Sequence, residues 1–175
     1  MRNQFNIICL ATTIMLNLLN LKIATAQSAA EKQRWEKHVK QTTIIRDEWD
    51  IPHIYGKTDA DAVFGLMYAQ CEENYPQIEK NYLEMLGRTA EILVPSGDKY
   101  ADLMMRLIQD SVDAIADYNA SPLWFKKLLD AHADGINYYL YKHPAVKSEV
   151  IKKYKPWYHL MWTDGSVSPT RTGGV

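Results

Sequence analysis

The chain has 175 residues, of which 47% are hydrophobic and 11% aromatic, and its formal net charge is −1. This length and composition suit one packed globular domain and argue against a disordered chain. Acidic and basic residues are nearly balanced, and the cluster Lys147, Lys152, Lys153 and Lys155 is typical of a solvated helix face, so the sequence argues against nucleic-acid binding.

Residues 1–26 have the pattern of a secretory signal peptide. Arg2 precedes an apolar run from Phe5 to Leu21, and Ala24-Thr25-Ala26 supplies a small-x-small cleavage sequence. Two asparagines, at positions 17 and 20, interrupt the run, which is then short for a bilayer span of about 20 residues. We therefore expect cleavage after Ala26, a periplasmic or secreted protein, and no membrane association of the mature chain, residues 27–175.

Cleavage would remove Arg2 and Lys22 but no acid, which changes the net charge from −1 to −3. It would also remove Cys9 and leave Cys71 as the one cysteine of the mature chain, so no intrachain disulfide is expected. A single thiol in a helical pattern is usually a small buried apolar group.

The mature chain begins with a charged and polar stretch around Trp35, residues 29–40, which predicts a leader or short helix. The β-branched run Thr42–Ile45 predicts a strand over residues 39–46, and residues 51–55 predict a second extended run. Asp47–Asp50 between them is a plausible turn, so we expect a hairpin.

Helical patterns dominate the rest of the chain. Thr58 is a candidate N-cap for a helix that ends near Glu73, and small residues such as Gly65 would let a neighbouring element approach closely. Pro76 suits the first turn of a second helix, which Gly87 would end.

Two more helices are expected further along. The apolar spacing predicts one helix over residues 100–118 and another that starts from a Ser121-Pro122 cap and stops at His143-Pro144. Residues 163–175 are rich in Gly, Ser, Thr and Pro and predict a loop.

Several short motifs follow one another in residues 42–141. Asp47–Ile54 contains an Asp, a turn and Pro-His-Ile, and Thr58–Gln70 contains Asp-Ala, an aromatic-Gly pair and Tyr-x-Ala-Gln. Together they resemble the start of the α chain in the penicillin acylase and acyl-homoserine-lactone acylase family, which are N-terminal-nucleophile hydrolases. The likeness continues through Asn74–Glu79, Leu86–Glu91 and Ala131–Asn137. Asp50 stands where the family usually has Gly, and Cys71-Glu72-Glu73 also departs from the family pattern.

The resemblance implies an α+β parent, a four-layer αββα sandwich, to which this mainly helical part contributes an N-terminal strand or hairpin and wrapping helices. In such enzymes a precursor cuts itself, and the Ser released at the start of the β chain attacks an amide carbonyl with its own α-amino group as base. The resemblance therefore places no catalytic residue in this chain, and Ser166 is not expected to be a nucleophile. Calcium is possible in the complete enzyme, with no ligand assigned here.

Candidate substrate-binding residues lie near residue 160. Trp157, Tyr158, Met161 and Trp162 form an aromatic and sulfur-rich cluster, where family α chains place a helix that helps to wall the acyl pocket. We take Trp157, Met161 and Trp162 as substrate-facing candidates, and the alternative is that they only pack a core.

Other residues that suggest chemistry have structural explanations. His53 lies in an extended run without a paired Ser or Cys, and Asp47, Asp59 and Asp61 suit a turn and a helix N-terminus as well as a metal site.

The sequence thus predicts the α-chain part of an exported hydrolase that acts on linear amides of the penicillin or N-acyl-homoserine-lactone type. Its partners would be the β chain of the same precursor and a small-molecule amide, and it would be inactive without that β chain. The alternative is an exported, non-catalytic helical binding or interaction protein derived from the same fold.

Overall fold

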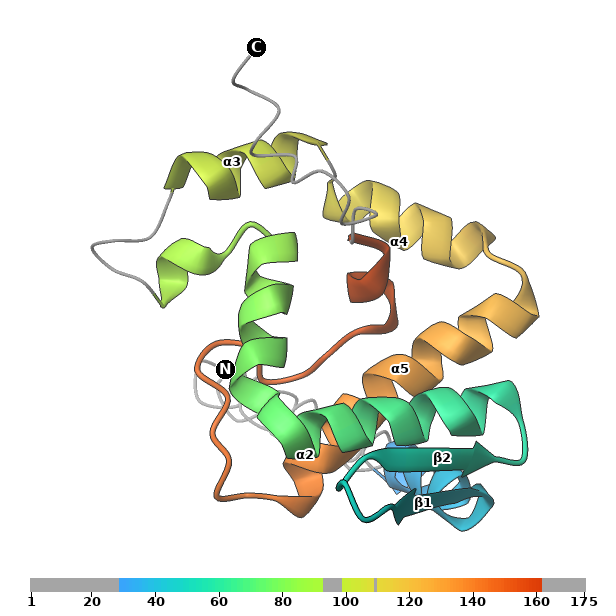
Figure 1. The fold of residues 1–175 in the computed structure, drawn as a ribbon. Helices are drawn as coiled ribbons and strands as arrows, with labels where there is room; N and C mark the ends of the chain where they lie inside the picture. Colours follow the sequence, from blue (N-terminus) through green and yellow to red (C-terminus); the bar gives the residue numbers. More distant parts are fainter. Residues whose placement is uncertain (1–28, 93–98, 109, 162–175) are drawn as a thin grey trace, which may run out of the picture. The chain divides into compact units, whose positions relative to one another are not determined.

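The computed structural model describes residues 29–92, 99–108 and 110–161 (Figure 1). Contacts divide the chain into two compact units, residues 1–37 and 38–175. A helix over residues 29–41 confirms the predicted leader helix, and its first part, residues 29–37, belongs to the first unit. The predicted signal peptide lies outside the described residues.

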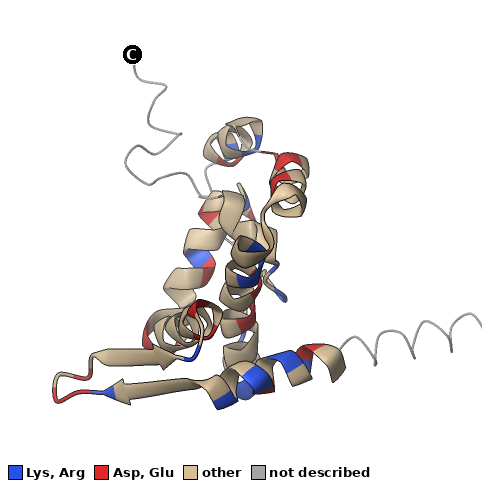
Figure 2. Ribbon diagram, turned by 90° about the vertical axis from the view of Figure 1, so that its right-hand side faces the viewer, with Lys and Arg blue, Asp and Glu red and all other residues tan. Residues whose placement is uncertain are grey.

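The second unit begins with the predicted hairpin. Strands β1 (Thr42–Arg46) and β2 (Pro52–Gly56) pair antiparallel, with Thr42 opposite Gly56 and Arg46 opposite Pro52. The Asp47 carboxylate accepts hydrogen bonds from two backbone N–H groups of the turn, and Asp50 has a φ of 62°. The aspartate at position 50 therefore adopts the left-handed conformation for which the family usually has Gly. Figure 2 shows acidic residues gathered at this turn.

Helix α2 (Asp59–Met85) starts at the predicted cap. The Thr58 hydroxyl accepts from the Asp61 N–H at 3.3 Å, and the Asp61 carboxylate accepts from the Thr58 N–H at 3.0 Å, which completes a capping box. The hairpin packs against this helix at Gly65, where an added Cβ would lie 2.5 Å from the side chain of Thr42. The prediction of close approach at a small residue is therefore confirmed.

A kink divides α2 where the sequence predicts two helices. Asn74 has a non-helical φ of −160°, and its side-chain oxygen accepts from the Gln77 N–H, as an N-cap does. Pro76 then lies in the first turn of the second half, where its missing N–H costs little. The second half ends at Gly87, which has a φ of 59°, and a 3₁₀ helix, η1 (Thr89–Glu91), follows.

The prediction of one helix over residues 100–118 is wrong, because this segment forms two helices, α3 (Lys99–Ile108) and α4 (Ser111–Ala120). Asp110 is extended, and its carboxylate accepts from the Val112 N–H at 3.0 Å, so it starts a new helix.

The next boundary also differs from the prediction. Ser121 closes α4 by donating to the Asp117 carbonyl at 2.7 Å, and Pro122 itself is the cap position of α5 (Leu123–Lys142). The predicted stop at His143 is confirmed. The lysine cluster at residues 147–155 lies in an irregular segment with bends rather than on the expected helix face, before the final 3₁₀ helix η2 (Pro156–Met161).

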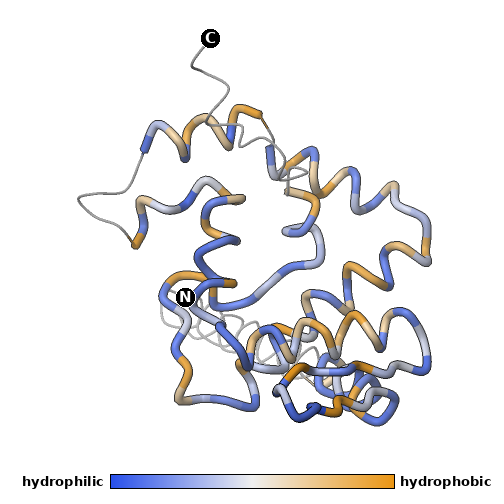
Figure 3. The backbone as a smooth tube through the Cα atoms, viewed as in Figure 1, coloured by the Kyte–Doolittle hydropathy of each residue, from blue (hydrophilic) through white to orange (hydrophobic). Residues whose placement is uncertain are grey.

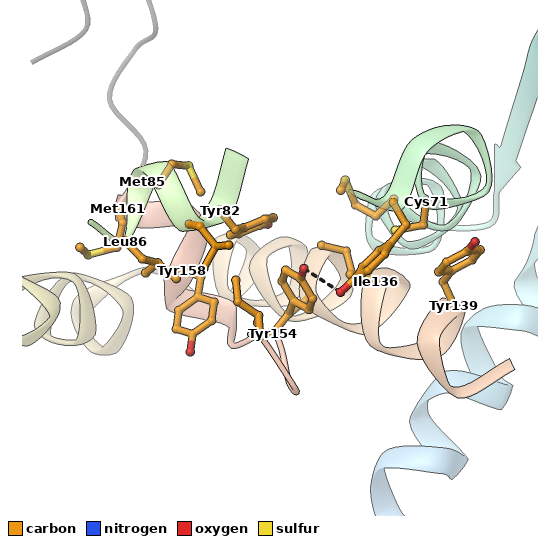
Figure 4. Packing of buried hydrophobic residues seen from close by; sticks show 14 of the residues in the cluster. Cys71, Tyr82, Met85, Leu86, Ile136, Tyr139, Tyr154, Tyr158 and Met161 are labelled. Carbon is orange, nitrogen blue, oxygen red and sulfur yellow. Dashed lines mark hydrogen bonds between the residues drawn. The ribbon is translucent and has the colours of Figure 1, made fainter. Parts of the chain in front are cut away.

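The core lies between α2, α5 and the segment that leads into η2 (Figure 4). Gly135 of α5 meets α2 so closely that an added Cβ would lie 2.5 Å from the Phe64 carbonyl oxygen. Cys71 is fully buried, as predicted, and burial raises the pKa of its thiol to about 12. Aromatic rings fill much of the remaining space, including Tyr82 and Tyr154, whose centroids lie 4.9 Å apart.

Helices α3 and α4 leave large apolar side chains exposed. Figure 3 colours the backbone by hydropathy and shows where hydrophobic residues occur along these two helices. Met104, Ile108 and Val112 are 41%, 48% and 67% exposed, whereas Phe64 and Met67 of α2 are buried inside this unit. No helix within the described ranges is long and apolar enough to cross a membrane.

A buried carboxylate joins two segments that lie about 70 residues apart in the chain. Glu79 of α2 is 4% exposed, and its oxygens accept from the N–H groups of Glu149, Val150 and Ile151 at 2.8–2.9 Å and from the Ser148 hydroxyl at 2.8 Å. Burial alone would raise the pKa of Glu79, but these donors outweigh it and hold the pKa below its usual value.

A second buried side chain holds the segment between α5 and η2 in place. The Asn137 side chain of α5 donates to the Tyr154 carbonyl at 2.9 Å and accepts from the Tyr154 N–H at 2.8 Å. Two buried polar side chains therefore determine where η2 starts.

We predict that Glu79→Gln lowers the free energy of unfolding by about 2 to 4 kcal/mol, because a neutral amide loses the charge-assisted bonds and brings donors of its own. Urea unfolding followed by circular dichroism measures this. Glu84→Gln, an exposed acid on the same helix, is the control and should change stability by less than about 0.5 kcal/mol. Equal effects of the two changes would contradict the role of Glu79 in holding residues 148–151.

Candidate substrate pocket

The structure places two of the three predicted substrate-facing residues in η2, and Trp162 lies outside the described residues. Trp157 is half-buried, and its ring meets Tyr158 edge to face with centroids 4.6 Å apart. Met161 is 3% exposed and belongs to the hydrophobic core cluster. Figure 4 shows Met161, Leu86 and Tyr158 at one end of that cluster.

Trp157 and Met161 also line a pocket of about 460 Å³. Its walls come from the end of α2, from α3, from the start of α4 and from η2. The lining residues are Leu86, Arg88, Arg106, Asp110, Ser111, Trp157, Tyr158 and Met161. This volume falls in the range of small-molecule sites, and the walls combine apolar surface with a few polar groups, as such sites do.

The two arginines of the pocket differ in their partners. Arg88 forms a bidentate pair with Glu91, with N···O distances of 2.6 and 2.8 Å. Arg106 donates from Nε to the Gly87 carbonyl at 3.0 Å, which is a neutral acceptor. Arg88 is therefore neutralised within the chain. Arg106 is exposed, and the pKa of Glu91 is lowered mainly by its hydrogen bonds with Arg88 and more weakly by the charge of Arg106.

A helix end positions the acidic side of the pocket. Asp110 uses Oδ1 to cap α4 through the Val112 N–H, and the Ser111 hydroxyl also donates to Oδ1 at 3.3 Å. Asp102 anchors the loop that carries Arg88 by accepting from the Thr89 and Ala90 N–H groups at 2.9 and 2.8 Å. Local capping thus sets the geometry of this wall.

The other residues with possible chemistry have structural partners. His53 Nε2 lies 2.9 Å from Asp47 Oδ2, and this contact, together with the turn N–H groups, lowers the pKa of Asp47. Asp61 caps α2 and lies 2.8 Å from His38 Nδ1, and the Thr58 and His38 contacts outweigh burial and lower its pKa. In residues 29–92, 99–108 and 110–161, no group of three or more His, Cys, Asp or Glu side chains is arranged to hold a metal ion.

The acids that depart from the family pattern also have a structural role. Glu72 and Glu73 both pair with Arg46 at the end of β1 and so tie the hairpin to α2. Ser166, which was not expected to be a nucleophile, lies outside the described residues.

A second, smaller cavity of about 170 Å³ lies between α2 and α5, beside η2. His132 of α5 and His159 of η2 have ring centroids 4.3 Å apart, and Tyr82 Oη lies 3.1 Å from His132 Nδ1. Burial, reinforced by the neighbouring His159, lowers the pKa of His132 to about 3. The His132 ring therefore stays neutral at neutral pH, and its contact with His159 joins η2 to α5.

Sequence reasoning missed the residues that hold the pocket in place, namely Glu79, Asp102, Arg106 and Asn137. One local signal was present for Glu79, an acid that occupies the apolar stripe with Ile78 and Tyr82. The others carry no local sign of their long-range partners.

Comparisons with known proteins agree with this fold. The family model for penicillin amidase matches residues 41–167, so the chain belongs to the penicillin amidase family. It is 32% identical over 97 residues to the penicillin acylase 2 proenzyme of Pseudomonas sp. (strain SE83), which is 55% of this chain and 12% of that proenzyme.

A solved structure adds support for the fold alone. The chain is similar to the thermostable penicillin G acylase from Alcaligenes faecalis in tetragonal form, with a TM-score of 0.58 and 19% identity. The match covers 69% of this chain and 68% of that one. The expected fold, mainly helical with a two-stranded hairpin, is thereby confirmed.

The histidine pair predicts a dependence of stability on pH. His132 has a pKa of about 3 in the folded chain against an ordinary value of 6.5, so the unfolded chain binds more protons between these values. The neutral His132 ring therefore contributes its full stability above pH 6.5. As the pH falls below this value, the free energy of unfolding decreases by at most about 1.4 kcal/mol per pH unit.

Urea unfolding at pH 7, 6 and 5 should therefore show a decline that His132→Gln reduces. Lys127→Gln, an exposed substitution on the same helix, should leave the decline unchanged. An unaltered slope in His132→Gln would show that the burial of His132 does not govern stability in this range.

Proposed function

We propose that this chain is the α-chain part of a linear-amide hydrolase of the penicillin amidase family and acts together with a β chain from the same precursor. The observation that carries the proposal is the family match over residues 41–167, which includes both the hairpin and the pocket wall. The substrates proposed from the resemblance are amides of the penicillin or N-acyl-homoserine-lactone type.

The apolar surface of α3 and α4 supports a partner chain. Met104 and Ile108 lie one turn apart on α3, Val112 lies in the first turn of α4, and all three stay exposed in this unit. Contiguous apolar patches mark interaction sites in soluble proteins. One relative, the penicillin acylase 2 proenzyme, is matched by this chain over 12% of its length, which supports a second and longer chain.

In this proposal the two chains divide the chemistry. The β chain supplies an N-terminal Ser, whose own α-amino group takes the proton as the hydroxyl attacks the amide carbonyl. Collapse of the tetrahedral intermediate breaks the C–N bond, the amine leaves with a proton, and water then releases the acid. Trp157 and Met161 contribute an apolar wall that holds part of the substrate and excludes water.

The exported location is a further proposal, supported by the order of charged start, apolar run and Ala24-Thr25-Ala26. We predict that the periplasmic or secreted product begins at Gln27, and mass spectrometry of the intact chain checks this. A product that retains Met1–Ala26 in the cytoplasmic fraction would contradict export.

For activity, we predict that the 175-residue chain alone hydrolyses neither penicillins nor N-acyl-homoserine lactones, and that co-expression with the β chain of a close acylase gives turnover. Trp157→Ala in the complex should lower kcat/KM by about ten- to hundredfold through lost substrate contacts. Ser166→Ala is the matched control and should change nothing.

Two results would count against this account. Turnover by the chain alone that disappears with Ser166→Ala would place the nucleophile here. A monomeric, sharply melting chain that gains neither stability nor activity on co-expression would instead favour a helical binding or interaction protein of the same fold.

A further inference from the structure

Two imidazole rings meet where η2 packs against α5. The rings of His132 and His159 have centroids 4.3 Å apart and planes inclined by 36°. On the α2 side, Tyr82 Oη lies 3.1 Å from His132 Nδ1. Burial raises the pKa of Tyr82, so its hydroxyl keeps its proton and can donate it to the Nδ1 of a neutral imidazole. The contact as it stands therefore suits a neutral His132.

The surroundings of the pair offer nothing that would stabilise a positive charge. The cavity of about 170 Å³ beside it is lined, among the described residues, by neutral side chains: Met67, Gln70, Ile78, Asn81, Tyr82 and the two histidines. Burial is the main reason why the pKa of each histidine lies below its ordinary value. Two protonated rings at this separation would also repel each other.

The acids on the neighbouring elements are engaged elsewhere or exposed. Asp130 of α5 accepts from the Tyr118 hydroxyl at 2.7 Å, and Glu79 of α2 accepts from residues 148–151. Helix α4, which packs against η2, carries Asp110 as its cap and two exposed acids, Asp113 and Asp117. None of these acids raises the pKa of either histidine.

Two cations beside η2 have partners of their own. Arg88 is held by both oxygens of Glu91, and Lys155 Nζ lies 5.6 Å from the centroid of the Trp157 ring. The charge balance around η2 therefore changes in mild acid through the histidine pair.

The chain that leads into η2 is held by groups that keep their charge state in mild acid. Glu79 stays ionised, because its donors hold its pKa below the usual value, and the Asn137 amide that binds Tyr154 does not titrate. The buried side chains of Tyr158 and Met161 add apolar contacts that are independent of pH. Protonation of the histidines therefore acts on η2 and leaves the segment up to Tyr154 in place.

We propose that protonation of the His132–His159 pair releases η2 from α5 while the rest of this unit stays folded. The wall formed by Trp157 and Met161 is then present at neutral pH and lost in acid, and His159 is the positioning residue that makes it so. This rests on the proposed function for what the wall does, but the release itself is measured without catalysis.

The expected size of the effect follows from proton binding. His132 has a pKa of about 3 when η2 is docked, and the ordinary value of 6.5 applies once the ring is released. The released state therefore binds more protons as the pH falls, and the docked state loses stability in that direction. Between pH 7 and pH 5 the ratio of released to docked chains should rise about 20-fold through His132 alone.

The test measures backbone amide hydrogen exchange by mass spectrometry in the 175-residue chain at pH 7 and pH 5. Each rate is divided by the intrinsic rate at the same pH, which gives a protection factor. Residues 157–161 should lose about 20-fold in protection, and at both pH values they should be less protected than residues 133–139 in the buried part of α5.

Variants assign the effect to the histidines. Glutamine is neutral at both pH values, so the chain with both His132→Gln and His159→Gln should show about the same protection of residues 157–161 at pH 7 and pH 5. Each single change should remove part of the loss. Lys127→Gln, an exposed change on α5, is the control and should keep all of it. Circular dichroism verifies that the variants fold.

Three results would overturn the inference. The protection of residues 157–161 could be the same at pH 7 and pH 5, or its loss could persist in the folded double variant. Equal protection of residues 157–161 and 133–139 at pH 5 would show that acid unfolds the whole unit instead of releasing η2. None of these results depends on whether the assembled chains hydrolyse amides, so a failure here is distinct from a failure of the proposed function.

Discussion

The carboxylate of Glu79 is the interaction on which the pocket depends. It accepts four hydrogen bonds from residues 148–151 in a site that is almost closed to water, which is why its pKa falls although burial opposes ionisation. Removing one partner from such a network leaves several donors unsatisfied. The segment after α5 has no regular structure of its own before η2, so Glu79 and Asn137 fix its path.

The η2 side of the candidate pocket follows from this arrangement. The path set by Glu79 brings Tyr154 against Tyr82 and leads the chain into η2, which carries Trp157 and Met161. Helices α2 and α5 can support it because Gly135 allows the two helices to come into backbone contact. The polar side is then added locally by helix caps and turns, with Asp102 and Asp110 as the main examples.

The features that the sequence predicts correctly are those decided by neighbours in the chain. The hairpin, the Thr58 cap and the end of α2 just before Gly87 all depend on residues no more than 14 positions apart. The break between α3 and α4 also depends on neighbouring residues, because Asp110 caps α4. It was not predicted, because the apolar spacing continues across this position.

The tethers at Glu79 and Asn137 escaped prediction for a different reason. Their partners are mainly backbone groups 17 to 72 residues away, and a backbone N–H or C=O leaves no trace in the sequence. Trp157 and Met161 were selected by composition and by resemblance, and their place on a pocket wall depends on these tethers. Arg106 was missed because its partner is the backbone carbonyl of Gly87, 19 positions away in the chain.

The account's central claim is that η2 and the pocket beside it face the reacting amide in the assembled hydrolase. A crystal structure of this chain with its β chain and a non-hydrolysable N-acyl amino acid analogue tests that claim most directly. The account predicts that the analogue contacts Trp157 and Met161, with its carbonyl carbon at near-attack distance, about 3 to 3.5 Å, from the N-terminal nucleophile of the β chain. An analogue bound at the nucleophile with this pocket filled by β-chain side chains, or facing solvent on the far side of the enzyme, would contradict it.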